Sequence, residues 1–473
     1  MMEEFKKRGH DVVYWLGYEG RDSEAPPGTT FHSYEDALLG RPASALASLE
    51  LEPPGAELIK KFYRLESLVL TMMNRIADDK CVDERRHLYY KMLSYWLGVL
   101  KKYQPEAIIF PVPPHFAYDF VIYELAKFLN IKTLMFLDTR IPGRALFLND
   151  IWRGSGDLQE KLRENAGKNF QLEELSSDIK KYYLMNTDKN YNALPPHIRY
   201  QKIKYSLWYR IFYSSKLMES IRDLSIFKRG WGFLRRAILK KDFLKPVLFL
   251  FGGLLKDNLK KEYARFQLPP DFSKNFVYAP LNVQPEQSTS PQGDMFADQI
   301  LMIEILASVL PKGWLIYVKE HPIQWLRSGV EFSSSKYRGY YKKISEIKNV
   351  CLVPVETSSN RLIKESQAVA AISGAAGWEA VLRSKPAMIF GYPWYLDCPG
   401  LFRVSDSDSC KEALKKINQG FLLDRQQIIN YLSSLDKAAI RAFLTPNAGE
   451  DANLTFEESM SNITNKLIEE LKL

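Results

Sequence analysis

The sequence predicts an α/β protein built from two Rossmann-like domains that face a cleft, with a basic helical segment between them. Apolar, strand-like runs alternate with amphipathic stretches near residues 107–137, and the same alternation returns at residues 276–390. Such alternation is typical of parallel sheets covered by helices. A length of 473 residues also exceeds the usual size of one domain. We therefore place the domains at residues 1–195 and 269–473, with the basic segment at residues 196–268.

Composition and cysteine usage indicate a cytoplasmic globular protein. Hydrophobic residues make up 46% of the chain and charged residues 26%, which is ordinary for globular proteins. The cysteines share no ligand-like spacing, which favours reduced thiols over disulfides or a zinc site. We expect no secretory leader, because MMEEFKKRGHDVVYW lacks an apolar core. The uncharged apolar run at residues 246–255 is shorter than the roughly 20 residues that span a bilayer.

The N-terminal half is predicted to contain a βαβ unit. A helix at residues 3–9 followed by a strand at residues 11–16 makes us expect an earlier strand upstream of this start. Residues 56–103 carry apolar side chains at helical spacing. The βαβ unit follows, with strands at residues 107–111 and 132–137 around a helix at residues 118–129. Residues 151–195 are polar and helical, and we expect them to be peripheral.

The C-terminal half is predicted to be a second doubly wound sheet. The expected strands are residues 276–280, 314–318, 350–353, 368–372 and 387–390, and the expected helices are residues 299–310, 358–365, 377–382 and 456–471. Ligands of such sheets bind beyond the carboxyl ends of the strands. Polar side chains at these ends are therefore the candidates for a binding site.

One candidate is the strand–turn–helix stretch AAISGAAGWEAVLRSKPAMIFG at residues 370–391. Ser373 is expected to cap the helix, while Gly374 and Gly377 let backbone N–H groups approach a ligand closely. A helix N-terminus with free N–H groups is an anion site. Glu379, expected in the first turn, suits a bidentate grip on ribose hydroxyls. An ordinary capped strand–turn–helix explains the pattern equally well.

The second candidate is IYVKEHPIQW at residues 316–325, where Lys319, Glu320 and His321 end an apolar strand. A histidine facing an anion site can donate a hydrogen bond to a phosphate, and Lys319 adds positive charge. In a transfer reaction this neutralises the departing phosphate. The simpler alternative is a loop histidine without a ligand. Both candidates follow successive core strands, so we expect them to converge.

Together with FVYAPLNVQPEQSTSPQGDMFADQ, these stretches resemble the capsule polysaccharide biosynthesis protein family, which includes bacterial Kdo transferases with a GT-B fold. The resemblance covers roughly residues 270–400 in order and with similar spacing. His321 and Pro322 match the His-Pro element of the family, whose histidine is expected on the donor phosphate. Ser373 and Gly374 match its Ser-Gly turn. Ala375 departs from the family pattern, in which a threonine is common.

The resemblance implies a nucleotide-sugar glycosyltransferase that makes a capsular or other surface polysaccharide. It implies a CMP-activated 2-keto sugar such as Kdo as the donor and a lipid-linked or glycan acceptor. It also implies no cofactor and no metal, since basic and backbone groups take over that role. Gln284 and Ser288 are expected donor contacts. The DSD stretch at residues 406–408 resembles a metal motif, but it precedes CKEALKKIN and is better explained as a helix cap.

The catalytic carboxylate has three candidates: Asp119, Asp138 and Glu286. It would deprotonate the acceptor hydroxyl, or attack the anomeric carbon in a retaining route. Each candidate also has a simpler role. Asp119 favours a helix N-terminus, Asp138 can pair with Arg140, and Glu286 can shape its loop.

The basic character of the chain is local. Residues 200–266 hold 16 Lys and Arg against 5 Asp and Glu, a net charge of +11, so the rest of the chain, with a total of +9, carries −2. An aromatic, basic helix of this kind can lie on an anionic membrane surface, which suits a peripheral enzyme on the inner face of the plasma membrane. A solvated interdomain segment explains it equally well. Nucleic acid is not an expected partner, since the sequence shows no motif for it.

Two other functions fit parts of the sequence. A CDP-glycerol-type glycerophosphotransferase would use a similar anion site, but such polymerases usually carry a second His-Pro element, and HPIQ is alone here. A non-catalytic component of a polysaccharide assembly or export complex would explain the alanine at position 375. Nucleotide binding without sugar turnover would favour this last function.

Overall fold

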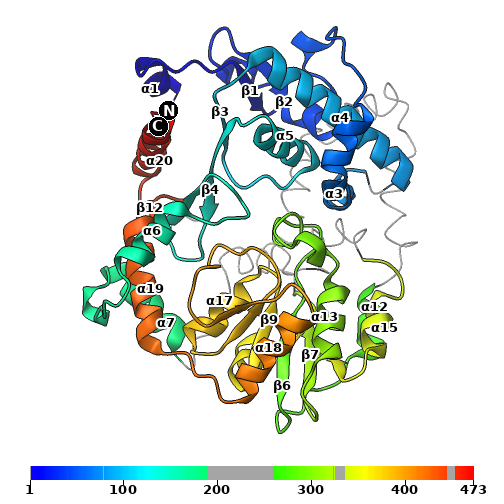
Figure 1. Ribbon diagram of the computed structural model, residues 1–473, viewed down its shortest axis with the longest axis vertical. Helices are drawn as coiled ribbons and strands as arrows, with labels where there is room; N and C mark the ends of the chain where they lie inside the picture. The colour runs from blue at the N-terminus through cyan, green and yellow to red at the C-terminus, as the bar shows by residue number, and fades with distance from the viewer. Residues whose placement is uncertain are drawn as a thin grey trace, which may run out of the picture.

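The computed structural model describes residues 2–77, 79–188, 259–322, 324, 336–444 and 453–472. The described residues form two α/β units, the N-terminal one at the top of Figure 1 and the C-terminal one at the bottom. The predicted α/β class with two Rossmann-like units is confirmed. Most of the basic segment, residues 196–258, lies outside the described residues.

The C-terminal sheet has six strands in the doubly wound order. They are β6 (Phe276–Pro280), β7 (Leu315–Lys319), β8 (Val350–Leu352), β9 (Ala368–Ala371), β10 (Ala387–Ile389) and β11 (Leu401–Arg403). Their spatial order is β11-β10-β9-β6-β7-β8, and every neighbouring pair is parallel. From β6 the chain adds β7 and β8 on one side of the sheet. It then crosses to the other side of β6 and adds β9, β10 and β11. The topological switch point therefore lies between β6 and β9.

Helices cover both faces of this sheet, which is why its strands are apolar throughout. One face packs on α12 (Leu259–Phe266), α13 (Gln299–Ser308), α15 (Tyr340–Glu346) and α18 (Ser407–Asn418). The other packs on α16 (Ser359–Glu365), α17 (Ala375–Leu382) and α19 (Arg425–Ala438). Along β6, Phe276 and Tyr278 belong to one core, while Val277 and Ala279 belong to the other. This alternation follows from the two-residue repeat of a strand.

The N-terminal unit keeps the predicted βαβ unit but has a mixed sheet. The pair β1 (Tyr14–Gly17) and β2 (Thr30–Ser33) is parallel and separate, and the main sheet runs β12-β5-β4-β3. The strands of the main sheet are β3 (Ala107–Phe110), β4 (Lys132–Asp138), β5 (Arg144–Leu148) and β12 (Ile440–Arg441). The helices of this unit are α1 (Met2–Lys7), α2 (Tyr34–Leu38), α3 (Ala56–Met72), α4 (Val82–Tyr103) and α5 (Ala117–Phe128). Among the described strands of the main sheet, only β3 and β4 form a parallel pair. A short connection returns the chain from β4 into β5, so β4 and β5 are antiparallel.

The end of the chain returns to the N-terminal unit, which the predicted division at residue 269 missed. Strand β12 pairs antiparallel with β5. Helix α20 (Phe456–Leu471) buries Ile463 and Leu467 in the same core as Phe136 and Phe147. Figure 1 accordingly shows the two chain ends together, beside α1 and α20. An amphipathic tail helix was predicted correctly, but its apolar stripe does not say which domain it covers.

Residues 151–188 are not peripheral, which corrects another expectation. Helix α6 (Gly156–Glu164) packs on α19, and α7 (Ser177–Thr187) packs on α17. Ile179 and Tyr183 are buried. The indole N–H of Trp378 on α17 donates to the hydroxyl of Tyr182 on α7 at 2.9 Å. A polar segment with few apolar residues can therefore still join the two units.

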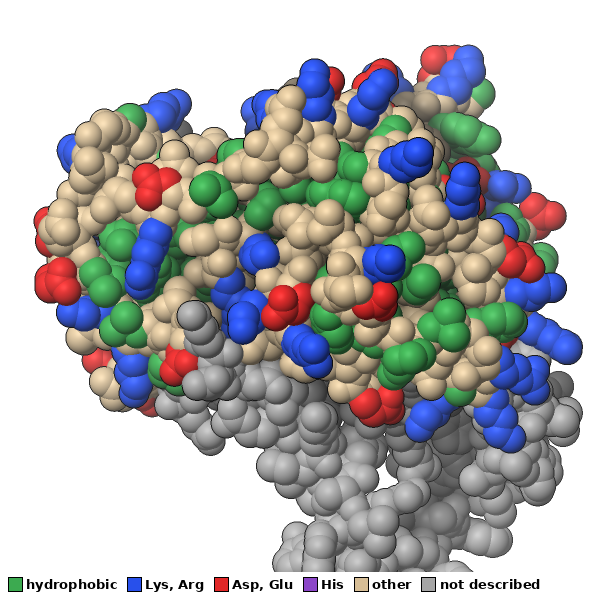
Figure 2. Space-filling view, turned by 90° about the horizontal axis from the view of Figure 1, so that it is seen from below, with side chains coloured by type: hydrophobic (Ala, Val, Ile, Leu, Met, Phe, Trp, Pro, Cys, Tyr) green, Lys and Arg blue, Asp and Glu red, His purple; other side chains and the backbone are tan. Residues whose placement is uncertain are grey.

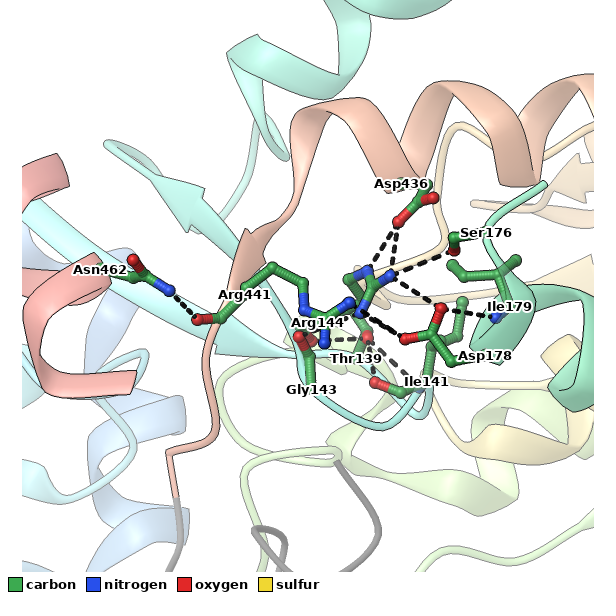
Figure 3. A network of polar contacts seen from close by, with 10 residues as sticks. All are labelled: Thr139, Ile141, Gly143, Arg144, Ser176, Asp178, Ile179, Asp436, Arg441 and Asn462. Atoms are coloured by element: carbon green, nitrogen blue, oxygen red, sulfur yellow. Dashed lines mark hydrogen bonds and ion pairs between the residues drawn. The ribbon is translucent and has the colours of Figure 1, made fainter. Parts of the chain in front are cut away.

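A buried arginine connects β5 with α7 and α19 (Figure 3). Arg144 is 1% exposed and makes ion pairs with Asp178 at 3.0 Å and with Asp436 at 2.7 Å. Its guanidinium also donates to the hydroxyl of Ser176 at 3.3 Å. A buried guanidinium needs such partners, because desolvating the charge is costly. This network, rather than apolar packing alone, joins the three elements.

Within the described part of the chain, no helix combines the length and the apolar character that crossing a membrane requires. On the described part of the face seen in Figure 2, basic side chains are mixed with acidic and hydrophobic ones. The described part of this face therefore forms no single charged patch.

Candidate functional site

The two candidate stretches flank the strand at the switch point. His321 follows β7 and Ser373 follows β9, and both strands pair with β6. Neighbouring strands lie about 4.8 Å apart, so the carboxyl ends of β7 and β9 lie roughly 10 Å apart across β6. We expected the stretches to follow successive core strands; instead β8 comes between β7 and β9 in the chain, and β6 lies between them in the sheet. This spacing suits a ligand that spans the switch point.

The N-terminus of α17 keeps its role as a candidate anion site. Gly374 is its N-cap, and as a glycine it has no side chain that could make a capping hydrogen bond. The carbonyl of Gly374 accepts a 2.5 Å hydrogen bond from the hydroxyl of Tyr395. Ser373 does not cap the helix as predicted, since its hydroxyl donates to the carbonyl of Ser288 at 2.6 Å. The first N–H groups of α17 therefore remain available to an anion.

Two positions on α17 differ from their predicted roles. Gly377 serves packing, because an added Cβ would lie 2.5 Å from the hydroxyl oxygen of Tyr395 and 2.8 Å from Ile389, and its role in ligand approach stays a prediction. Glu379 lies in the second turn, not the first. Burial raises the pKa of Glu379, while Arg383, Arg140 and Lys319 act in the opposite direction. A ribose contact by Glu379 stays a prediction.

The loop after β6 lies over the Ser-Gly turn. Its residue Ser288 accepts the Ser373 hydrogen bond through its carbonyl, so a donor contact by the Ser288 side chain stays a prediction. Gln284 is buried, and its side-chain amide donates to the carbonyl of Ala297. That contact fastens the loop and leaves the predicted donor contact of Gln284 untested. Asn282 also belongs to this site, since its side chain lies 3.2 Å from where a Cβ on Gly374 would be.

Lys319 and Glu320 have structural partners behind the site. The ammonium group of Lys319 donates to the carbonyl of Thr357 at 2.6 Å and to the hydroxyl of Ser359 at 2.7 Å. The carboxylate of Glu320 is fully buried and pairs with Lys336 at 2.5 Å. With 0% exposure the side chain has a structural role, and the donor contact of Glu320 stays a prediction. Lys319 is 4% exposed and is directed toward the loop before α16.

The buried carboxylate instead holds the backbone of the His-Pro element. Glu320 accepts a hydrogen bond from the backbone N–H of His321 at 2.7 Å and from the hydroxyl of Tyr341 at 2.5 Å. His321 itself is half-buried at the end of β7. The interaction of His321 with a donor phosphate stays a prediction, and its position at the switch point agrees with that role.

The structure brings two of the three candidate catalytic carboxylates near one cation. Burial raises the pKa of Glu286, and local desolvation raises that of Asp138 to about 6 although its side chain is exposed. The positive charge of Arg140 opposes both shifts, as it does for Glu379. Asp138 comes from the N-terminal sheet and Glu286 from the loop after β6. From the sequence, Arg140 was expected to pair with Asp138 alone, and its effect on Glu286 and Glu379 was not predicted.

Asp119 takes the simpler role that its position suggested. It lies in the first turn of α5 and accepts the backbone N–H of Phe116 at 2.8 Å. Burial raises its pKa to about 7, against the opposing effects of three backbone N–H groups and of Arg75. The positive charge of Arg75 also opposes the rise in the pKa of Glu286. Its guanidinium donates to the carbonyl of Pro285 at 3.2 and 3.3 Å. Sequence reasoning missed Arg75, since a lone arginine after a helix is unremarkable.

We expect Asp119→Asn to stabilise the protein at pH 8 but not at pH 4. Asparagine keeps an oxygen that accepts the Phe116 N–H, but it carries no charge to desolvate. The folded-state pKa of Asp119 rises from 3.8 to about 7, so ionisation costs no stability below pH 4 and progressively more as the pH approaches 7. At 1.36 kcal/mol per unit the gain is at most about 4 kcal/mol. Thermal midpoints of both proteins from pH 4 to 8 check it, and a pH-independent difference would contradict it.

The DSD stretch is a helix cap, as predicted. Asp406 is the N-cap of α18, and its carboxylate accepts the backbone N–H of Ser409 at 2.8 Å. Among the described residues, no group of three or more His, Cys, Asp and Glu side chains is placed to hold a metal ion.

Comparisons with known proteins connect this site to a family. Residues 273–424 match the sequence model of the capsule polysaccharide biosynthesis protein family. Comparison with curated proteins finds no match. Among solved structures, the beta Kdo 2,7 transferase of Thermosulfurimonas dismutans KpsC is 17% identical with a TM-score of 0.25, and the match covers 44% of this chain and 62% of that one. The chain thus spans less than two thirds of that protein.

Two further structures are similar at the same level. The beta Kdo 2,4 transferase of Thermosulfurimonas dismutans KpsC is 10% identical over 69% of this chain and 78% of that one, with a TM-score of 0.33. UDP-GlcNAc 2-epimerase from Methanocaldococcus jannaschii is 12% identical over 74% and 80%, with a TM-score of 0.26. Scores this low carry no argument about function. The match to the sequence model of the capsule polysaccharide biosynthesis protein family is independent of these structures. It covers residues 273–424, which include β6, the His-Pro element and the Ser-Gly turn.

Proposed function

We propose that this chain is a GT-B-type glycosyltransferase of capsular or other surface polysaccharide biosynthesis. The main supporting observation is the N-terminus of α17, which has a glycine as its N-cap and follows β9, one of the two strands at the switch point of a parallel sheet. This arrangement lies within the stretch that matches the family. The proposed donor is a CMP-activated 2-keto sugar such as Kdo.

The proposed chemistry relies on backbone and basic groups. The donor phosphate would lie at the N–H groups of α17, where the helix dipole favours negative charge. His321 would donate a hydrogen bond to it from the other side of β6. As the bond between the anomeric carbon and the phosphate oxygen breaks, these donors stabilise the charge on the departing nucleotide. We propose a metal-independent reaction on this basis.

The catalytic carboxylate is proposed to be Asp138 or Glu286. Both lie in the electrostatic range of Arg140. A pKa of about 6 for Asp138 is close to neutral pH, which suits a general base that takes the acceptor's hydroxyl proton. In a retaining route, the same carboxylate would attack the anomeric carbon as the nucleotide leaves.

The acceptor is proposed to be a glycan, free or lipid-linked, that enters from the N-terminal unit. A lipid-linked acceptor would bring the enzyme to the inner face of the plasma membrane. The aromatic and basic composition of residues 196–258 supports this location.

Nucleotide-dependent stabilisation tests the donor class. We expect CMP to raise the thermal midpoint more than CDP, UDP or GDP at equal concentration. A nucleotide at about 100 times its dissociation constant stabilises a protein by roughly 2.7 kcal/mol. A larger shift with UDP or GDP would contradict the CMP-linked donor, a larger shift with CDP would favour the glycerophosphotransferase, and no shift with any nucleotide would favour a non-catalytic component.

A further inference from the structure

Three aromatic rings form a row on the N-terminal unit. The rings belong to Tyr18 after β1, Tyr34 at the start of α2, and Phe116 before α5. The centroids of Tyr18 and Tyr34 are 5.7 Å apart, and those of Tyr34 and Phe116 are 5.8 Å apart with the rings nearly perpendicular. Tyr18 is 65% exposed, while Tyr34 and Phe116 are half-buried. We call these three residues the aromatic row.

The aromatic row begins next to a candidate catalytic carboxylate. The guanidinium of Arg75 lies 4.7 Å from the ring centroid of Phe116. The same guanidinium donates to the carbonyl of Pro285, the residue before Glu286. Arg75 therefore joins the row, on the N-terminal unit, to the loop after β6 on the C-terminal unit. A ligand lying along the row has one end near the loop that carries Glu286.

Hydrogen bonds hold the exposed end of the row in place. The backbone N–H of Glu19, next to Tyr18, donates to the carboxylate of Glu35 at 3.0 Å. The hydroxyl of Ser33 donates to the same carboxylate at 3.0 Å, and its oxygen caps α2. The segment that carries Tyr18 is thus fixed to α2 before any ligand arrives. A binding surface fixed in advance loses less conformational entropy when it binds.

We propose that the aromatic row is the subsite for the acceptor glycan, an inference that rests on the proposed transferase function. Sugar rings offer C–H faces that pack on aromatic rings and hydroxyl edges that need polar partners. The row supplies both, because it carries two tyrosine hydroxyls and the guanidinium of Arg75 lies over the ring of Phe116. The guanidinium of Arg75 lies over Phe116 and donates to the carbonyl of Pro285, so a polar group stands at the inner end of the row. A glycan held there would present a hydroxyl to Glu286.

The test is binding of an array of defined bacterial surface oligosaccharides by the wild type and by Tyr18→Ala. Tyr63→Ala is the matched control, because Tyr63 on α3 is 67% exposed and lies outside the row. We expect the wild type and Tyr63→Ala to bind the same glycans, and Tyr18→Ala to bind them at least tenfold more weakly by calorimetry. Equal binding by Tyr18→Ala, or no glycan bound by the wild type, would overturn the proposal.

A second variant and a second ligand separate the possible failures. Tyr34→Ala is expected to lose glycan binding as well, and circular dichroism with the thermal midpoint shows whether it folds. Because Tyr18 is exposed, Tyr18→Ala decides the question if Tyr34→Ala does not fold. If Tyr18→Ala binds glycan as tightly as the wild type and nucleotide still binds, the glycan subsite is wrong but the transferase function is not contradicted. If Tyr18→Ala weakens glycan binding but no nucleotide binds to any of the proteins, the transferase function is contradicted and the glycan subsite is supported.

Discussion

Lys336→Met is expected to lower the free energy of unfolding by about 3–5 kcal/mol, the usual cost of removing one partner from a buried ion pair. The ammonium of Lys336 and the carboxylate of Glu320 are both 0% exposed and lie 2.5 Å apart. Without Lys336, the carboxylate stays buried, and its partners among the described residues are the Tyr341 hydroxyl and the His321 N–H. Two hydrogen bonds do not compensate for a desolvated charge.

Urea unfolding of three variants checks this result. Lys342→Met is the matched control, since Lys342 pairs with Glu346 at the surface, where both side chains are more than 60% exposed and such pairs contribute little. The double variant Glu320→Gln/Lys336→Met is expected to regain much of the loss, because it removes both charges and keeps an acceptor for the His321 N–H. A loss below about 1 kcal/mol for Lys336→Met would contradict the buried pair.

Arg144→Met is expected to destabilise the protein by roughly 2–4 kcal/mol, since hydrogen bonds to charged groups contribute about 1.5–3 kcal/mol each. Arg144 bonds Asp178, Ser176 and Asp436, so its loss releases α7 and α19 from β5 together. Asp178 and Asp436 are 41% and 21% exposed, so water can solvate both carboxylates afterwards. The effect should therefore be smaller than for Lys336.

The midpoint of urea unfolding measures this effect as well. Arg153→Met is the control, because the side chain of Arg153 is 86% exposed and its contact with Asp150 is at 4.0 Å. We expect the control to change stability by less than about 0.5 kcal/mol. Equal stability of Arg144→Met and Arg153→Met would show that the network in Figure 3 does not join these elements.

The sequence predicted the C-terminal sheet well because its strands are apolar on both faces and bounded by turns. β6 was predicted to the residue, and α17 within two residues of its start. The return of β12 and α20 to the N-terminal unit was missed, since an apolar stripe does not identify its partner. Tertiary contacts also decided the roles of single residues. The burial of Glu320 depends on Lys336, sixteen residues away, and nothing in the local sequence marks that pair.

The candidate site was predicted in part for the same reason. His321 and Gly374 lie at strand ends, a position that local patterning reveals, and the structure places both beside β6. Arg75 and Arg140 act on carboxylates from other segments, so only the fold brings them together. Tyr395 gives Gly377 a packing role that the sequence did not reveal, because packing glycines and binding glycines share the same local sequence.

The most direct test of the central claim is CMP-dependent thermal stabilisation of the wild type, His321→Ala and His87→Ala. His87 is exposed on α4, far along the chain from the switch point, and serves as the control. If His321 binds the donor phosphate, CMP raises the midpoint of the wild type and of His87→Ala, and His321→Ala loses most of that shift. If His321→Ala keeps the full shift, His321 does not bind the donor phosphate at the switch point. If CMP shifts none of the three proteins, the proposed CMP-linked donor is wrong.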